Sequence, residues 1–219
     1  MPRLLFEKTG NAIWMSHLDL MRLFQRAFKR ADLPLKHTQG YNPRPSVSIA
    51  LPLSVGVESV CELLDFELDG VNVPCEEITQ RLNSALISGV RVHKTYLSGR
   101  KLRELSLLDC VVTLEYNNGV PENAQSSILE LFQREAVIVV KKTKTGMQDQ
   151  DIIPMIRKIN VFQVDADVLQ LHARICCQNP TLNPAQLVSA IKTYLPDFTP
   201  DFTKCNRIEI MDTNEEIFR

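Results

Sequence analysis

The order of the expected helices and strands constrains the fold of this chain more than any other sequence feature. Apolar residues at strand and helix spacing, divided by prolines and glycines, predict the order β-α-β-β-α-β with one extra strand along the first half. The second half follows a similar order, without a recognisable repeat of the residues themselves. This order is typical of a split βαβ unit, so the sequence predicts an α+β protein of two ferredoxin-like domains in tandem.

The chain length agrees with two domains. Its 219 residues suffice for two domains of about 110 residues each, and its 44% hydrophobic content is enough for a packed core. The first domain is expected over residues 1–97 and the second over residues 109–219. Residues 98–108 are polar and have no evident partner, so we interpret them as the linker.

The individual elements are expected as follows. In the first domain we expect strands over 3–8 (with an optional extension to 14), 35–39, 46–53, 60–68 and 89–97, and helices over 16–31 and 74–87. In the second domain we expect strands over 110–116, 136–142, 161–165, 168–177 and 207–211, helices over 121–134 and 184–195, and a short inserted helix over 151–159.

The helix expected from Ser16 to about Ala31 is the most distinctive segment. Ser16 is a suitable N-cap, and Asp19 can return the capping bond. Apolar residues recur at helical spacing, and four cations fall mostly on the opposite face. Cations four residues apart repel by about 0.2–0.5 kcal/mol per pair unless an anion lies over them. The face is either a solvated surface or an anion-binding surface, with RNA phosphate as the favoured anion. Its cations are Arg22, Arg26, Lys29 and Arg30.

Two neighbouring features add candidate binding groups. His17 would lie in the first helical turn, where the helix dipole favours a neutral imidazole that can act as a general base; a structural role is the common alternative. Asn42 and Arg44 each precede a proline, which holds them in a stiff, extended turn. Stiffness lowers the entropy lost when Arg44 binds a ligand, although the segment can also be an ordinary loop. Tyr41 is the one aromatic residue that is free to stack on a base, and stacking is not indicated for the others, which fall mostly on apolar stripes.

Charge is unevenly distributed although the net charge is −1. Residues 1–56 hold eight Lys and Arg against three Asp and Glu, whereas residues 57–97 hold three against seven. A near-neutral total can therefore hide a basic surface. Glu58, Glu62 and Asp65 are spaced closely enough to bind a divalent cation, but pairing with arginines is the more common role, and no metal is predicted.

A second basic segment lies near the middle of the second half. Lys141 and Lys144 leave an expected strand and enter a loop that contains Gly146. They can extend a phosphate-binding track, or they can belong to a solvated hairpin tip.

Several classes of protein are excluded by missing motifs. The chain has no Walker loop, dinucleotide-binding glycine motif, zinc-protease motif or nucleophile elbow, so no cofactor and no reaction are predicted. The six cysteines form no CxxC pair, and most lie in apolar runs where a buried, reduced thiol is expected. With neither a signal-peptide pattern nor an apolar run long enough for a membrane, a cytoplasmic protein without a membrane partner is expected.

The chain resembles a known bacterial family in three segments. These are S-H-L-D-L-M-R-x-F-x-R-A-x-x-R-A at 16–31, G-Y-N-P-R-P at 40–45 and L-P-L-S-V-G-V-E-S at 51–59. They look like the radical-SAM-linked protein family, small bacterial proteins encoded beside, or fused to the C-terminus of, a radical SAM protein. A later K-x-x-K…D-I-x-P pattern, from Lys141 to Pro154, agrees with this, and the resemblance covers nearly the whole chain.

The resemblance implies a radical SAM enzyme as the working partner. Such an enzyme needs a cysteine triplet that this chain lacks, so the chain is similar to the stand-alone accessory form. The family motif coincides with the basic helix and the turn after it. The residues at which it places function are His17, Asp19, Arg22, Arg26, Arg30, Asn42, Arg44 and Glu58.

Three functions remain open from the sequence. The first is an accessory protein that binds RNA, or presents substrate, for a radical SAM enzyme that modifies tRNA or rRNA; DNA is not an expected partner. The second is a metal-independent RNA endonuclease similar to the CRISPR repeat-processing nucleases, with His17 as base and Arg22 or Arg26 stabilising the transition state. The third is a protein-interaction module whose basic face docks onto an acidic surface.

Overall fold

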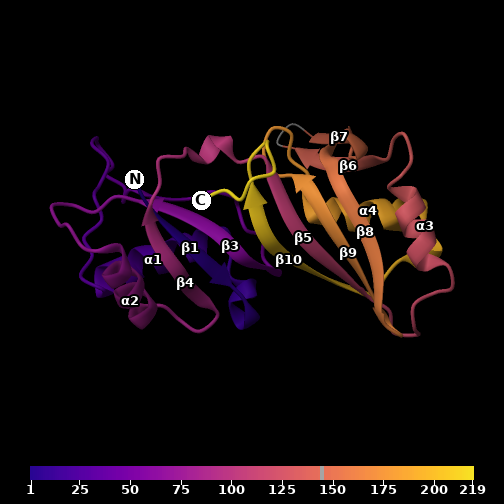
Figure 1. Cartoon of the computed structure of the whole chain (residues 1–219), viewed down its shortest axis with the longest axis horizontal. Coiled ribbons are helices and arrows are strands. Elements are labelled where there is room, and N and C mark those ends of the chain that lie inside the picture. The colour runs from indigo at the N-terminus through magenta and orange to yellow at the C-terminus, as the bar shows by residue number, and fades with distance from the viewer. Residues whose placement is uncertain (144–145) are drawn as a thin grey trace. The chain divides into compact units, whose positions relative to one another are not determined.

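The computed structural model describes residues 1–143 and 146–219, and it is a mixed α+β structure (Figure 1). The chain divides into two compact units, Met1–Glu104 with Arg219, and Leu105–Phe218. Among the described residues, no helix is both long enough and apolar enough to cross a membrane.

The first unit is a four-stranded antiparallel sheet with two helices. Its strand order is β4-β1-β3-β2, so β1 and β2 run parallel with β3 between them, and β3 and β4 run parallel with β1 between them. The elements are β1 (Pro2–Lys8), the 3-10 helix η1 (Gly10–Trp14), α1 (His17–Arg30), β2 (Val47–Ile49), β3 (Val57–Phe66), α2 (Cys75–Ala85), β4 (Val90–Leu97) and η2 (Leu102–Glu104).

The second unit repeats this strand order as β10-β5-β9-β8, again with antiparallel neighbours. A separate hairpin, β6-β7, is inserted after its first helix. The elements are β5 (Leu107–Glu115), α3 (Ala124–Leu131), β6 (Ile138–Thr143), β7 (Gly146–Asp151), η3 (Ile153–Met155), β8 (Ile156–Asp165), β9 (Val168–Cys176), α4 (Pro184–Tyr194), η4 (Pro196–Phe198) and β10 (Phe202–Met211).

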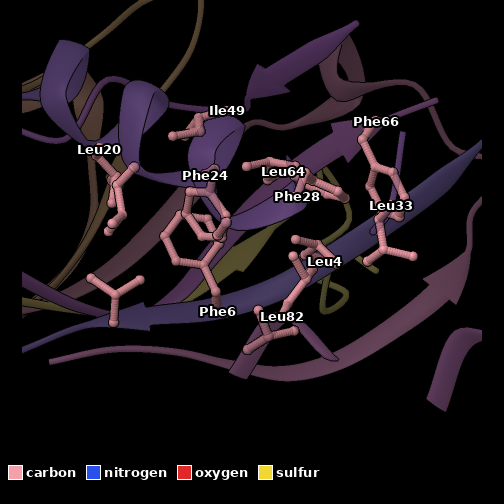
Figure 2. Close-up of a cluster of buried hydrophobic side chains, with 14 of the residues drawn as sticks. Leu4, Phe6, Leu20, Phe24, Phe28, Leu33, Ile49, Leu64, Phe66 and Leu82 are labelled. Carbon is pink, nitrogen blue, oxygen red and sulfur yellow. The ribbon is translucent and has the colours of Figure 1, made fainter. Parts of the chain in front are cut away.

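The core of the first unit positions the basic helix. The apolar face of α1 packs onto β1 and β3, where Phe6 and Phe24 meet edge to face with ring centroids 4.7 Å apart, and Phe28 and Phe66 meet at 4.9 Å (Figure 2). Burying this stripe turns the charged side of the helix outward. The buried residues of α1 are Leu20, Leu23, Phe24, Ala27 and Phe28.

Two expected elements of the first unit are different in the structure. The first strand ends at Lys8 as predicted, but its optional extension to Trp14 is wrong, since η1 takes its place. The buried Lys8 ammonium donates hydrogen bonds to the carbonyls of Ile13 and Met15, both at 3.1 Å, and so holds this segment back against the end of the strand. The strand expected over 35–39 is reduced to isolated bridges, Leu35 with Leu68 and His37 with Pro45.

The second unit corrects one expected helix. The inserted helix expected over 151–159 is only the short η3, and β8 begins at Ile156 because that segment pairs with β9. The strand β7 was not expected, since its sequence GMQDQD lacks the apolar alternation of a half-buried strand. The expected linker 98–108 contains η2 and the first two residues of β5.

Candidate nucleic-acid interface

The start of α1 is capped as the sequence predicts. The Ser16 hydroxyl accepts a hydrogen bond from the Asp19 backbone N–H at 3.2 Å and donates one to the Asp19 carboxylate at 2.6 Å. Arg22 lies 3.4 Å from the same carboxylate. The pKa of Asp19 therefore lies below its ordinary value, first because of the Ser16 hydroxyl and then because of the Arg22 charge.

The cations further along α1 are exposed and differ in their partners. Arg22 pairs with Asp19, but Arg26, Lys29 and Arg30 have no carboxylate within 4.0 Å in the part of the chain that the structure describes. Lys29 and Arg30 lie in the last helical turn, where they also offset the negative end of the helix dipole. This second role does not apply to Arg26, which lies outside the last turn. The face can therefore bind an anion without breaking an existing ion pair.

A groove runs beside the second half of α1. Its volume is about 610 Å³, and it lies between the helix and the loop that leads to β2. The groove brings Lys29 together with His37 and with Pro45, the residue that follows Arg44. The lining residues are Gln25, Lys29, Asp32, Leu33, Pro34, Leu35, His37 and Pro45.

The Pro-bracketed turn has a fixed backbone and exposed side chains. Thr38 donates its backbone N–H to the Arg44 carbonyl at 2.9 Å, and its hydroxyl accepts from the Arg44 N–H at 3.0 Å. The side chains of Asn42 and Arg44 are exposed, and Tyr41 is 100% exposed. The turn thus holds a guanidinium and a phenol ring in solvent at the edge of the groove.

A second hollow continues the basic surface towards α2. Its volume is about 680 Å³, and it lies between the end of α1 and the second helix. Arg30 from α1 and Arg81 from α2 both line it, although Arg81 already forms an ion pair with Glu77. The basic surface, defined here as Arg26, Lys29, Arg30 and the turn 40–45, therefore has hollows on two sides.

His17 is not brought together with the arginines. It is the first residue of α1 and is half-buried, and its enclosed Nδ1 has no hydrogen-bond partner among the described residues. Arg26 follows nine residues later, about 2.5 turns and roughly 14 Å along the axis, so it projects from the opposite side of the helix. Arg22 is rotated by about 140° from His17 on the same reckoning. The helix therefore does not assemble the base and the charge-stabilising group of the endonuclease hypothesis around one phosphate.

Two of the acidic residues considered as metal ligands, Glu58 and Asp65, bind other groups of the first unit. Glu58 accepts a hydrogen bond from the Gly10 N–H at 3.2 Å, so it supports η1 rather than the groove. Asp65 pairs with the buried Arg3 at 2.6 Å. Among the described residues, no three His, Cys, Asp or Glu side chains are grouped so that they could hold a metal ion.

Two of the eight N-terminal cations do not contribute to the surface. Arg3 is held in the ion pair with Asp65, and the Lys8 ammonium donates to three backbone carbonyls, including that of Ser54 at 3.3 Å. Burial of these residues depends on strand pairing, which charge counting along a sequence does not reveal.

The second basic segment belongs to the other unit. Lys141 donates to the Thr181 carbonyl at 3.2 Å, so its ammonium is partly satisfied inside that unit. Lys144 lies outside the described residues.

Sequence reasoning missed an exposed apolar cluster at the start of α1. Trp14 was expected on an apolar stripe but is 68% exposed, and Leu18 and Val55 are exposed by more than half. Gly56, next to Val55, lies against the Trp14 ring and donates its N–H to the Ile13 carbonyl at 2.9 Å. The usable signal was Leu18, which falls on the polar side of the helical pattern.

The chain belongs to the family described as "Uncharacterized protein conserved in bacteria (DUF2344)", whose pattern matches residues 2–184. No curated protein matches it. It is similar in fold to a chain from the crystal structure of a Cbf5-Nop10-Gar1 complex, with a TM-score of 0.54 and 8% identity over 95% of this chain and 48% of that chain. It is also similar to a chain from an H/ACA RNP bound to a substrate RNA containing 2'-deoxyuridine, with a TM-score of 0.50 and 8% identity over 94% and 46%. The chain thus spans about half the length of these structures, and the likeness is one of fold.

Proposed function

We propose that this protein binds RNA through its basic surface and serves as an accessory protein to a radical SAM enzyme that modifies tRNA or rRNA. One observation carries the RNA proposal: Arg26, Lys29 and Arg30 are exposed on one helix without a carboxylate partner in the described chain, beside a groove that ends at the stiff Arg44 turn. Phosphate fits this surface because it is the anion that several spaced cations bind together.

The similar structures are compatible with this proposal, but a likeness of fold does not establish RNA binding. One of the similar structures is a particle bound to a substrate RNA, and that binding is a property of the whole particle. We also propose that each unit is a ferredoxin-like domain, with the boundary near residues 98–108, because each sheet places a third strand between two parallel strands joined by a helix. Such folds host many functions, so the fold alone does not choose among them.

The radical SAM partner rests on the resemblance in motif. One motif segment, 51–59, is joined to the residues that lead into the basic helix, because Lys8 donates to the Met15 and Ser54 carbonyls and Gly56 donates to the Ile13 carbonyl. The exposed Trp14 next to this junction favours a second candidate function, a protein-docking module, since tryptophan is enriched in binding hot spots. In this arrangement one end of α1 contacts the protein partner and the other end contacts RNA.

The RNA proposal is tested by a charge reversal on α1. We expect Arg26→Glu to weaken binding of a fluorescent tRNA, measured by anisotropy, by about tenfold or more, and to reduce the salt slope of the binding constant by at least about one. Arg103→Glu makes the same change in net charge at an exposed arginine on η2 and serves as the matched control. Equal tRNA affinity in wild type and Arg26→Glu would refute the proposed site.

The partners are tested by purifying the tagged full chain from its native bacterium without nuclease. Sequencing of bound RNA and mass spectrometry of bound proteins should recover a defined RNA, lost in Arg26→Glu, and a radical SAM protein, lost in Trp14→Ala. Recovery of the enzyme without RNA would make the basic surface a protein interface. Recovered RNA cut at one position, with cutting abolished in His17→Ala, would instead support the endonuclease.

A further inference from the structure

The sheet of the second unit has one face that its helices do not cover. Along β9 the side chains of Leu169, Leu171, Ala173 and Ile175 are buried, whereas the alternating positions from Val168 to Arg174 are exposed or half-buried. The helices α3 and α4 contact β8 and β10 (Figure 1). The alternate face, called the open face here, carries its own set of side chains because successive residues of a strand point to opposite sides.

Strand register places polar groups in rows across the open face. Asn160, His172, Val111 and Asn206 lie directly opposite one another on four neighbouring strands. The Asn206 Oδ1 atom in this row is enclosed and has no hydrogen-bond partner in the described chain. Because this atom is enclosed, a ligand on the open face cannot contact it, and Asn160 at the other end of the row is the amide that lines the hollow described below.

Aromatic rings lie beside this row. Phe162 is 47% exposed and packs against the exposed His172 ring edge to face, with ring centroids 5.1 Å apart and an angle of 78° between the planes. A hollow of about 440 Å³ is lined by both rings, by Asn160 and by Lys158. This combination provides a stacking surface, an amide for a base edge and a cation for a phosphate.

The charges on the open face are mostly neutralised. Arg174 binds Asp109 and Glu215, and Lys204 binds Glu115. Lys158 is exposed and has no such partner in the described chain. A duplex is held mainly by phosphate contacts across its surface and is therefore poorly suited to this face, whereas unpaired bases can stack on its exposed aromatic rings.

We propose that the open face of the second unit binds single-stranded RNA, with a base stacked on Phe162 and His172 and its edge hydrogen-bonded by Asn160. The proposal deepens the proposed function and rests on it for the class of ligand, but it concerns a separate site. It assigns unpaired nucleotides to the second unit and phosphate contacts to the basic surface of the first.

The decisive comparison uses two substitutions at one position. Phe162→Leu keeps an apolar side chain but removes the ring, and Phe162→Tyr keeps the ring. We expect Phe162→Leu to weaken binding of a short single-stranded RNA to the full chain by about tenfold, the scale of one base stack, and Phe162→Tyr to bind within about twofold of wild type. Val140→Ala, at an exposed apolar position on the separate hairpin, is the control. Binding of an RNA duplex should not change in any of these variants.

Each outcome separates this proposal from the first one. Equal single-stranded RNA affinity in wild type and Phe162→Leu overturns the open-face site, and loss in Arg26→Glu in the same assay would leave the basic surface standing. Failure of the wild type to bind single-stranded RNA also overturns it. If Phe162→Leu leaves RNA binding unchanged and Phe162→Asp loses a co-purifying protein, the open face is a protein interface. Far-UV circular dichroism and thermal unfolding confirm that each variant is folded.

Discussion

Both units carry an arginine–aspartate pair across the same two strands, with the residues exchanged. In the first unit Arg3 on β1 binds Asp65 on β3, at 2.6 Å and 3.0 Å. In the second unit Asp109 on β5, the strand in the place of β1, binds Arg174 on β9, at 2.8 Å and 2.9 Å. Each pair is a forked, two-bond contact between directly opposed residues.

The two pairs differ in burial and in their other partners. The Arg3 side chain is 1% exposed and also donates to the Ser98 hydroxyl and the Arg100 carbonyl. Burial acts to lower the pKa of Arg3, but the hydrogen bond and charge of Asp65 outweigh it, so the pKa lies above its ordinary value. Arg174 is 23% exposed and is shared with Glu215. Loss of the aspartate should therefore lower stability more in the first pair than in the second, because water can reach and solvate Arg174 but not Arg3.

A second contrast concerns the first helix of each unit. The helix α1 has 14 residues and four cations, whereas α3, in the same topological place, has 8 residues, AQSSILEL, and none. The same fold accommodates both helices because each of them buries an apolar stripe against its sheet. The candidate RNA site thus depends on side chains added to a shared topology.

The largest effect is expected from breaking the buried pair. Asp65→Asn leaves the Arg3 charge buried without its counter-charge and should lower the free energy of unfolding by about 3–5 kcal/mol, measured by urea denaturation. Asp109→Asn is the matched control and should cost about 1 kcal/mol or less, because that pair is partly exposed. Equal losses would show that burial does not distinguish the two pairs.

A smaller effect separates two glycines with the same backbone angle. Gly89 and Gly119 both have φ of +85°, but a Cβ on Gly89 would lie 2.5 Å from the Thr9 carbonyl oxygen, whereas one on Gly119 would meet nothing closer than 3.6 Å. Gly119→Ala should cost about 1–2 kcal/mol from the left-handed backbone alone. Gly89→Ala should cost more, since its neighbour is backbone. Thermal unfolding of both variants measures the difference, and a smaller loss for Gly89→Ala would contradict the close packing of β4 against η1.

The smallest effect concerns the start of α1, which has a side-chain cap that α3 lacks. The pKa of Asp19 is lowered from its ordinary value of 3.8, so its contribution to stability is present above that pH and is lost as the pH falls through the lowered pKa. Ser16→Ala should raise the pKa of Asp19 towards the ordinary value, as measured by NMR titration of the carboxyl carbon. An unchanged pKa would assign the shift to Arg22 instead.

Features that depend on local spacing were accessible from the sequence. The helix from Ser16 was predicted with its cap, and so was the division of α1 into an apolar and a charged face. The turn 40–45 was predicted as a stiff, extended turn, because each proline acts on its immediate neighbour, and residues 40–44 are exposed in the structure. The hairpin over Ala166 and Asp167 was predicted from alternation on both sides of a short turn.

Features that depend on distant neighbours were not accessible in the same way. Lys8 and Arg3 counted as surface charge until strand pairing placed them against carbonyls and Asp65. The strand β7 is polar, so only its pairing with β6 identifies it as a strand. The surroundings of Trp14 depend on Gly56, which is more than 40 residues away in the chain and lies against its ring. Periodicity states which residues share a face but not what lies opposite them.

The sequence by itself determined where the basic helix begins, which side of it carries charge and which turn follows it, because capping, helical period and proline geometry act within a few residues. Only the tertiary structure decided which cations reach solvent and which side chains meet across the open face of the second unit. Strand register is the physical reason: it joins residues far apart in the chain, and a shift of one position would exchange the two faces of a strand.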